Sequence, residues 1–194
     1  MNVGRHMQAG TVTVKPDAPL CQARDLMEEH GFGLLLVAAS SGTLEGFITR
    51  AGLREIKDWD LPVSRVSHPV KFAVSPGDTL EKAALIMLAN RLVILPVVDD
   101  GRLVGVISQA ELLRGLTAAL GVGLEATRLT IKPAVNESSD VYAILDVLRK
   151  HNARIVSLMQ GVGPEGPSEI IVRIQEIDDR EKLRQDLEAA LAAG

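Results

Sequence analysis

The strongest constraint on how this chain folds is an internal repeat with a period of 60 residues. Residues 11–27 align with residues 71–87 without a gap, and valine, proline, leucine, alanine and methionine recur in register. Residues 34–53 then align with residues 94–112 if one residue in the hairpin turn of the first copy is left unmatched. Apolar, glycine and proline positions that agree over this length predict two copies of one structural unit.

Each copy has the pattern of a strand, a helix, a β-hairpin and a second helix. In the second copy, Asp78 and Glu81 predict a capping box at the start of the first helix. Asp100-Gly101 is typical of a hairpin turn, and a second helix is expected from Gln109. A unit of about 50 residues with only one buried sheet face is marginally stable alone. We therefore expect the two β-α-β-β-α copies to pack sheet against sheet.

The remainder of the chain has a different pattern. Its order, β-α-β-β-α, is the ferredoxin-like order without the final strand. The expected elements are a strand at 125–133, a helix at 138–151, strands at 153–160 and 168–175, and a last helix capped by Asp178 and Glu181.

Composition narrows the classes of function. The net charge of −4 argues against a protein that binds duplex DNA, and 3% aromatic residues weaken any proposal based on stacked bases. The basic residues between Arg149 and Arg154 are interpreted as a solvated helix end. Cys21 is the only cysteine, which excludes an internal disulfide and a thiolate metal cluster. The first residues do not predict a secretory signal, and the apolar run at 31–39 is too short to span a bilayer, so a cytoplasmic location is expected.

The doubled segment, about residues 5–118, resembles a tandem pair of CBS domains, also called a Bateman module. The resemblance depends most on LPVVDDGRLVGVIS at 95–108 and on LLLVAASSGTLEGFIT at 34–49. The last segment resembles an ACT domain, and the CBS–CBS–ACT order is similar to that of bacterial acetoin-utilization regulatory proteins. The expected fold is a mixed α/β and α+β architecture. Its expected domains are a first CBS domain at 1–60, a second at 61–121, and an ACT-like domain without a clear last strand at 124–194.

This resemblance implies a non-catalytic regulator. The partners that it implies are a second copy of the chain in a homodimer, an unidentified protein target and a small adenosine-type molecule. The implied ligands are AMP, ATP or S-adenosylmethionine, with no obligatory cofactor. Binding to nucleic acid or to a membrane is not expected. The alternative function is a structural dimerisation module whose ligand sites are degenerate.

Ser108 and Glu111 are the main candidate site. In CBS domains that bind nucleotides, a Ser or Thr at this position contacts phosphate, and an Asp three residues later accepts hydrogen bonds from both ribose hydroxyls. Glu111 keeps the charge on a side chain one methylene longer, whereas the first copy has Thr49 followed by Gly52 and lacks the acid. The same pair also fits a capping box, and the two roles are compatible.

Further candidates come from the same comparison. His68, Arg50 and Arg91 are candidate phosphate contacts, although each is also an ordinary surface residue. Val93 and Ile94 favour either core positions or an apolar wall for adenine. The complete set of candidate ligand contacts is Val74, Ile107, Leu95, Pro96, His68, Thr49, Arg50, Arg91, Ser108 and Glu111.

Other motifs are interpreted structurally. GVGPEG at 161–166 matches a dinucleotide-binding pattern, but a strand follows it, so a hairpin loop is expected. The turn at 132–140 lacks the glycine that amino-acid-binding ACT domains usually have there. No catalytic set is recognised, and no metal-ligand spacing is found among the histidines, which are His6, His30, His68 and His151.

Overall fold

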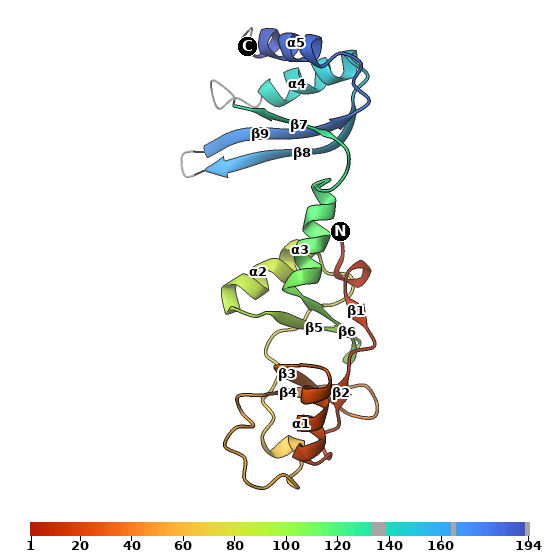
Figure 1. Ribbon diagram of the computed structural model, residues 1–194, viewed down its shortest axis with the longest axis vertical. Helices are drawn as coiled ribbons and strands as arrows, with labels where there is room; N and C mark the ends of the chain where they lie inside the picture. The colour runs from red at the N-terminus through yellow and green to blue at the C-terminus, as the bar shows by residue number, and fades with distance from the viewer. Residues whose placement is uncertain (133–138, 164–165, 193–194) are drawn as a thin grey trace. The chain divides into compact units, whose positions relative to one another are not determined.

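The computed structural model describes residues 1–132, 139–163 and 166–192 (Figure 1). The chain divides into two compact units, Met1–Gly115 and Leu116–Gly194. The first unit contains both repeats, and the second begins inside the helix that ends the second repeat.

The first repeat forms a small sheet covered by one helix. Strand β3 pairs in parallel with β2 and antiparallel with β4, and α1 buries Leu20, Ala23 and Met27 against the sheet. The expected second helix does not form, because residues 50–55 make turns in which Gly52 replaces the acid that would complete a capping box. The elements are β2 (Thr13–Val14), α1 (Leu20–Glu29), β3 (Leu34–Ala38) and β4 (Leu44–Thr49).

The second repeat has the expected helix, hairpin and helix, but its expected leading strand is reduced to a single parallel bridge between Val74 and Val97. Its first helix is capped one residue later than expected: Lys82 N–H donates to Thr79 Oγ1 at 3.2 Å. Asp78 instead accepts from Ser75 N–H at 2.8 Å and pairs with Lys82 Nζ at 2.7 Å. The elements are α2 (Leu80–Asn90), β5 (Ile94–Asp99), β6 (Arg102–Ser108) and α3 (Gln109–Ala119).

The two repeats exchange their leading segments. The 3₁₀ helix η1 (Val3–Arg5) and strand β1 (Gln8–Ala9) belong to the sheet and core of the second repeat, where β1 pairs with β6. The equivalent helix η2 (Val63–Arg65) lies in the first repeat, and the following His68 bridges to Phe47. The sequence carries this equivalence, since NVGR and PVSR are also 60 residues apart.

The exchanged contacts match one another residue by residue. Val3 N–H donates to Asp78 O at 2.8 Å, and Val63 N–H donates to Ala18 O at 2.9 Å. Both valines are fully buried. The valine that precedes the first repeat in the sequence therefore completes the core of the second repeat, and the valine that precedes the second repeat completes the core of the first.

Two glycines make room for the exchanged backbone. A Cβ on Gly105 would lie 2.5 Å from the carbonyl oxygen of Gln8, and one on Gly46 would lie 2.7 Å from that of His68. Both glycines lie within hairpin strands at matching positions of the repeat. Their small size, rather than an unusual backbone angle, is what the close approach requires.

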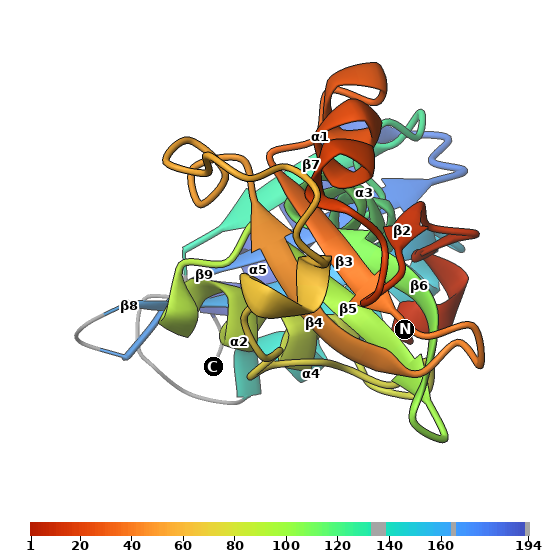
Figure 2. The ribbon, with the colours of Figure 1, turned by 90° about the horizontal axis from the view of Figure 1, so that it is seen from below.

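The two sheets of this unit face each other, with α1 outside the first and α2 and α3 outside the second (Figure 1). Seen from below, the sheet containing β3 lies in front of the one containing β5 (Figure 2). Side chains alternate along β5, so Leu95 and Val97 enter the repeat's own core while Ile94 and Pro96 face the space between the sheets.

The second unit is an antiparallel sheet of order β7-β9-β8 with α4 and α5 on one face (Figure 1). This is the expected β-α-β-β-α order, and Ile144, Val147 and Leu148 of α4 form the core with β9 and α5. The elements are β7 (Thr127–Ile131), α4 (Ser139–Lys150), β8 (Arg154–Gly163), β9 (Gly166–Gln175) and α5 (Arg180–Ala192).

Several local expectations for the second unit are refined by the structure. The last helix is capped by Asp179, whose Oδ1 accepts from Lys182 N–H at 3.0 Å, and not by Asp178. Gly163 pairs with Gly166, so a strand and not a helix follows the GVGPEG motif. Most of the turn expected at 132–140 lies outside the described residues.

Two basic residues near the end of α4 are paired with acids. Arg149 Nη2 lies 3.1 Å from Asp146 Oδ1, and His151 Nε2 lies 2.8 Å from Asp186 Oδ2. His151 therefore ties the end of α4 to α5, whereas the sequence interpretation expects a solvated helix end.

We predict that Gly105→Ala destabilises the first unit by about 1–3 kcal/mol, because a methyl group at this position overpacks against the Gln8 carbonyl. Urea unfolding followed by circular dichroism measures the change. Gly33→Ala is the matched control, since nothing lies within 4 Å of the added carbon. Equal stability losses in the two variants would contradict the close-approach explanation.

Candidate functional site

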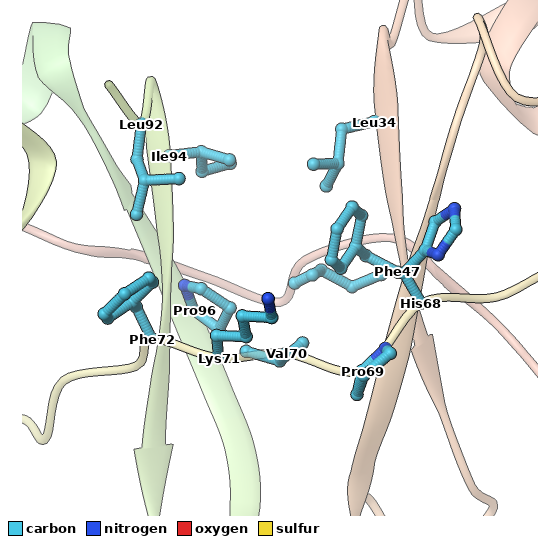
Figure 3. A pocket seen from close by; sticks show the side chains of 11 residues that line it. Leu34, Phe47, His68, Pro69, Val70, Lys71, Phe72, Leu92, Ile94 and Pro96 are labelled. Atoms are coloured by element: carbon cyan, nitrogen blue, oxygen red, sulfur yellow. The ribbon is translucent and has the colours of Figure 1, made fainter. Parts of the chain in front are cut away.

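A cavity of about 580 Å³ lies between the two sheets of the first unit (Figure 3). The first repeat contributes Leu34, Leu36 and Phe47, and the second contributes Leu92, Ile94 and Pro96. The segment that joins the repeats, residues 68–72, closes one side. This volume is in the range of small-molecule sites, which are mostly apolar with a few polar groups.

Aromatic side chains are concentrated at this cavity, although they are scarce in the chain. Phe47 and Phe72 line it, and they are two of only three phenylalanines in the protein. Figure 3 shows Phe47 beside Leu34 on one side and Phe72 beside Pro96 on the other. Aromatic and branched aliphatic walls of this kind suit a flat, apolar ring.

The polar side chains of the cavity lining are an imidazole and an ammonium group. His68 and Lys71 are both exposed, and the other lining residues are apolar. None of the eleven residues that line the cavity is acidic. The cavity therefore offers apolar walls to a ring and positive charge to an anionic group at its edge.

His68 is held in place by its backbone. Its N–H donates to Phe47 O at 2.8 Å, and Phe47 N–H donates to His68 O at 2.9 Å. The two rings lie with centroids 5.7 Å apart. The exchange of segments thus places one of the predicted candidates at the cavity.

The Ser108–Glu111 pair forms a capping box at the start of α3. Ser108 Oγ accepts from Ala110 N–H at 3.2 Å, and Glu111 Oε2 accepts from Ser108 N–H at 3.1 Å and from the Ser108 hydroxyl. The Glu111 side chain is buried, and its other oxygen accepts from Gln8 Nε2 at 2.9 Å. The carboxylate thus connects the helix cap to the exchanged strand β1.

These contacts lower the pKa of Glu111 below its usual value, chiefly through the hydrogen bond from the Ser108 hydroxyl. Burial acts in the opposite direction, while the Ser108 N–H and the Gln8 amide add to the lowering. The folded state therefore favours the charged carboxylate.

The remaining candidates are dispersed. Pro96 and His68 line the cavity, whereas Leu95, Val74 and Ile107 are core residues. Thr49 Oγ1 accepts from Gly52 N–H at 3.1 Å, so in the first copy the hydroxyl stabilises the turn that stands in place of the helix.

The two candidate arginines lie outside the cavity lining. Arg50 Nη2 donates to Met27 O at 2.8 Å, next to a separate hollow that also contains Trp59. Arg91 ends α2 with a left-handed backbone, φ 54°. Neither joins His68 at the cavity, so the structure does not gather the predicted phosphate contacts into one group.

Sequence reasoning did not identify Phe47, Phe72, Lys71 or Leu34 as site residues. The sequence did contain a usable signal. Of the three phenylalanines, Phe47 lies in the first hairpin and Phe72 lies in the segment that joins the repeats. The alternation along the first hairpin strand also separates Leu34 from its core neighbour Leu35.

The described part of the chain holds neither a metal-binding cluster nor a helix that could span a membrane. Within residues 1–132, 139–163 and 166–192, no group of three His, Cys, Asp or Glu side chains is arranged to hold a metal ion. Over the same residues, every helix is too short or too polar to cross a membrane.

We predict that Glu111→Gln lowers stability at neutral pH by about 1 kcal/mol, because it weakens the cap. A lowered pKa in the folded state contributes stability that is complete above the ordinary pKa, 4.5, and is lost as the pH falls through the folded value. Melting temperatures measured from neutral pH to about pH 3 should therefore converge for wild type and variant at the acid end. Exposed Glu45 provides the control Glu45→Gln, and a difference that stays constant with pH would contradict this account.

Known proteins provide an independent comparison. The CBS domain-containing protein YhcV of Bacillus subtilis is 29% identical over 111 residues, which are 55% of this chain and 79% of that protein. Inosine-5'-monophosphate dehydrogenase of Aquifex aeolicus is 27% identical over 175 residues, 80% of this chain, but the match spans only 35% of the enzyme.

Two solved structures have the same fold as the first unit. A CBS domain pair/ACT domain protein from Thermotoga maritima is 26% identical with a TM-score of 0.57, covering 62% of this chain and 99% of that one. CBSX2, solved in complex with AMP, is 25% identical with a TM-score of 0.54, covering 60% and 96%.

The family match follows the repeat. The CBS domain profile matches residues 3–57 and residues 63–118, and together these are more than half of the chain. Each match begins at the buried valine of an exchanged segment, Val3 or Val63. The tandem repeat found in the sequence is thus a pair of CBS domains, and the chain belongs to the CBS domain family.

Proposed function

We propose that this protein is a non-catalytic regulator that binds an adenosine-containing ligand in the cavity between its two CBS repeats. The observation that carries the proposal is the gathering of Phe47 and Phe72 around an apolar cavity with Lys71 at its edge. AMP in the CBSX2 structure supports the same class of ligand.

The proposed binding mode follows from the lining. The adenine ring packs between the aliphatic side chains of Leu34 and Ile94, and the phosphate or sulfonium end lies toward solvent. The Lys71 ammonium favours an anionic ligand such as AMP or ATP over cationic S-adenosylmethionine, and the His68 imidazole can donate a hydrogen bond to phosphate. Both repeats and their connecting segment would contact the ligand, which would couple occupancy to the arrangement of the repeats.

Ser108 and Glu111 remain part of the proposal as a second contact region. Gln8 Nε2 donates to Glu111 Oε1 in this structure, and Arg114 Nη1 lies 3.6 Å from the same oxygen, so ribose hydroxyls would have to share or replace these contacts. Ribose binding would then compete with the contact that ties β1 to α3. Of the other candidates, Pro96 and His68 fit the cavity mode directly.

The second unit is proposed to be an ACT-like sensing or dimerisation domain. Its support is the sheet order β7-β9-β8 with both helices on one face, which is the ferredoxin-like arrangement without its last strand. We place the domain limits near residues 60, 121 and 124. The proposed protein is a cytoplasmic homodimer that acts on an unidentified protein target. Its proposed role is like that of acetoin-utilization regulators. The alternative is a dimerisation module in which neither repeat binds a ligand.

We predict that AMP or ATP raises the melting temperature of the whole chain, because a ligand that binds only the native state stabilises it by about 2.7 kcal/mol at a hundredfold excess over Kd. Ile94→Trp should abolish the shift by filling the cavity, and Lys71→Ala should weaken binding about tenfold through loss of a charged contact. Each variant is compared with its own ligand-free melting temperature, measured by differential scanning fluorimetry.

Lys57→Ala is the matched control, since Lys57 is an exposed lysine outside the cavity lining. A shift that survives Ile94→Trp but vanishes in Glu111→Gln would place the ligand at the helix cap instead. No shift with AMP, ADP, ATP or S-adenosylmethionine would favour the dimerisation module.

A further inference from the structure

A smaller hollow lies in the first repeat, between α1 and the turns that stand in place of the expected second helix. It has a volume of about 250 Å³. Its apolar side is formed by Met27, Leu53 and Trp59, which also pack in the core of this repeat. We call it the Trp59 hollow. It shares no lining residue with the cavity between the two sheets, so the two are separate places on the first unit.

Three arginines give the Trp59 hollow a positive charge. Arg24, Arg50 and Arg54 line it together with a single carboxylate, that of Glu28. Arg50 and Arg54 are exposed, and Arg24 is half-buried. The chain as a whole has a net charge of −4, so this concentration of positive charge is a local feature.

The tryptophan ring is fixed by its backbone and holds one of the cations. Trp59 O accepts from Cys21 N–H at 3.0 Å, in the first turn of α1. The guanidinium carbon of Arg24 lies 4.8 Å from the centroid of the Trp59 ring. The same guanidinium donates to Asp25 Oδ1 from Nε at 3.1 Å and from Nη2 at 3.0 Å. Trp59 therefore forms part of the apolar wall and also orients a cation through its ring face.

The other two arginines are positioned by the turns that follow β4. Arg50 Nη2 donates to Met27 O at 2.8 Å, and Arg54 N–H donates to Ala51 O at 3.3 Å. A guanidinium group carries five N–H donors in a planar fork. The contact of Arg50 with one backbone oxygen therefore leaves further donors of that group for an oxyanion.

The second repeat has the apolar positions of this hollow but not its cations. Met27 and Leu53 correspond to Met87 and Leu112 in the alignment of the repeats, and these are also buried. The residues that correspond to the three arginines carry no charge; they are Ala84, Gln109 and Leu113. The fold thus uses the apolar residues in both copies, whereas it forms without the arginines in the second.

We propose that the Trp59 hollow is a ligand site that binds the phosphate or carboxylate group of a small organic anion. A guanidinium fork matches the paired oxygens of either group. The apolar walls strengthen the attraction, because a low-dielectric cleft concentrates the field of its charges. The volume lies below the range of about 300–1,000 Å³ that is usual for drug-sized ligands, so we expect an occupant smaller than a nucleotide. This site is additional to the adenosine site of the proposed function and does not depend on it.

Trp59 is the only tryptophan of the chain, so its fluorescence reports on this hollow alone. We would titrate the full chain with inorganic phosphate and with succinate, and with chloride at the same ionic strength. A saturable change with phosphate, succinate or both, and none with chloride, is expected. The probe with the lower Kd identifies the group that the hollow prefers. Isothermal titration calorimetry gives the same Kd by a second measurement.

Variants of exposed arginines locate the bound anion. Arg54→Ala should raise the Kd about tenfold through loss of a charged contact, and Arg54→Lys should recover part of the affinity because it keeps the charge but loses the fork. Arg65→Ala is the matched control, since Arg65 is an exposed arginine outside the lining of the hollow. It should bind both probes with the wild-type Kd.

Three results would overturn the proposal. The first is the absence of both a fluorescence change and a heat of binding with either probe. The second is an equal loss of affinity in Arg54→Ala and Arg65→Ala, which would indicate an unspecific effect of charge. The third is a response that Lys71→Ala abolishes and Arg54→Ala does not, which would place the anion in the cavity between the sheets. A melting shift with AMP in Arg54→Ala would leave the adenosine site intact, so the two proposals can fail separately.

Discussion

The first unit depends on the exchange of leading segments between its two repeats. Val3 fills the core of the second repeat and Val63 fills that of the first, each held by a backbone hydrogen bond of 2.8–2.9 Å. The strands that follow need Gly105 and Gly46 for their close approach. Each core contains a valine from the segment that precedes the other repeat in the sequence. The two sheets are held face to face because of this exchange. The cavity between them and its closure by residues 68–72 follow from the same constraint.

Glu111 stabilises the exchanged segment, although the sequence also predicts it to be a ligand contact. Its carboxylate completes the cap of α3 on one side and binds Gln8 of the exchanged strand on the other. The spacing of Ser108 and Glu111 predicts the cap from local rules. The contact with Gln8 joins positions 103 residues apart, so no local pattern could indicate it.

The sequence predicted the elements better than their ends and partners. Periodicity and the repeat predicted α2, the second hairpin, α3 and the order of the last unit, but the caps at Thr79 and Asp179 are each one residue later than predicted. Adjacent polar residues compete for a cap, and only backbone geometry decides between them. The helix expected after Thr49 does not form. Gly52 has a low helix propensity and lacks the carboxylate that would complete the capping box. The cavity could not be located from the sequence, because its lining residues come from both repeats and from the segment that joins them.

Removal of residues 1–9 followed by hydrogen exchange of the whole chain tests the exchange most directly. These residues directly precede the first repeat in the sequence but contribute to the core of the second in space. The structure predicts that protection falls in β5, β6 and the start of α2, while β3 and β4 keep theirs. Loss of protection confined to β3 and β4 would contradict the exchange and the arrangement of the cavity that follows from it.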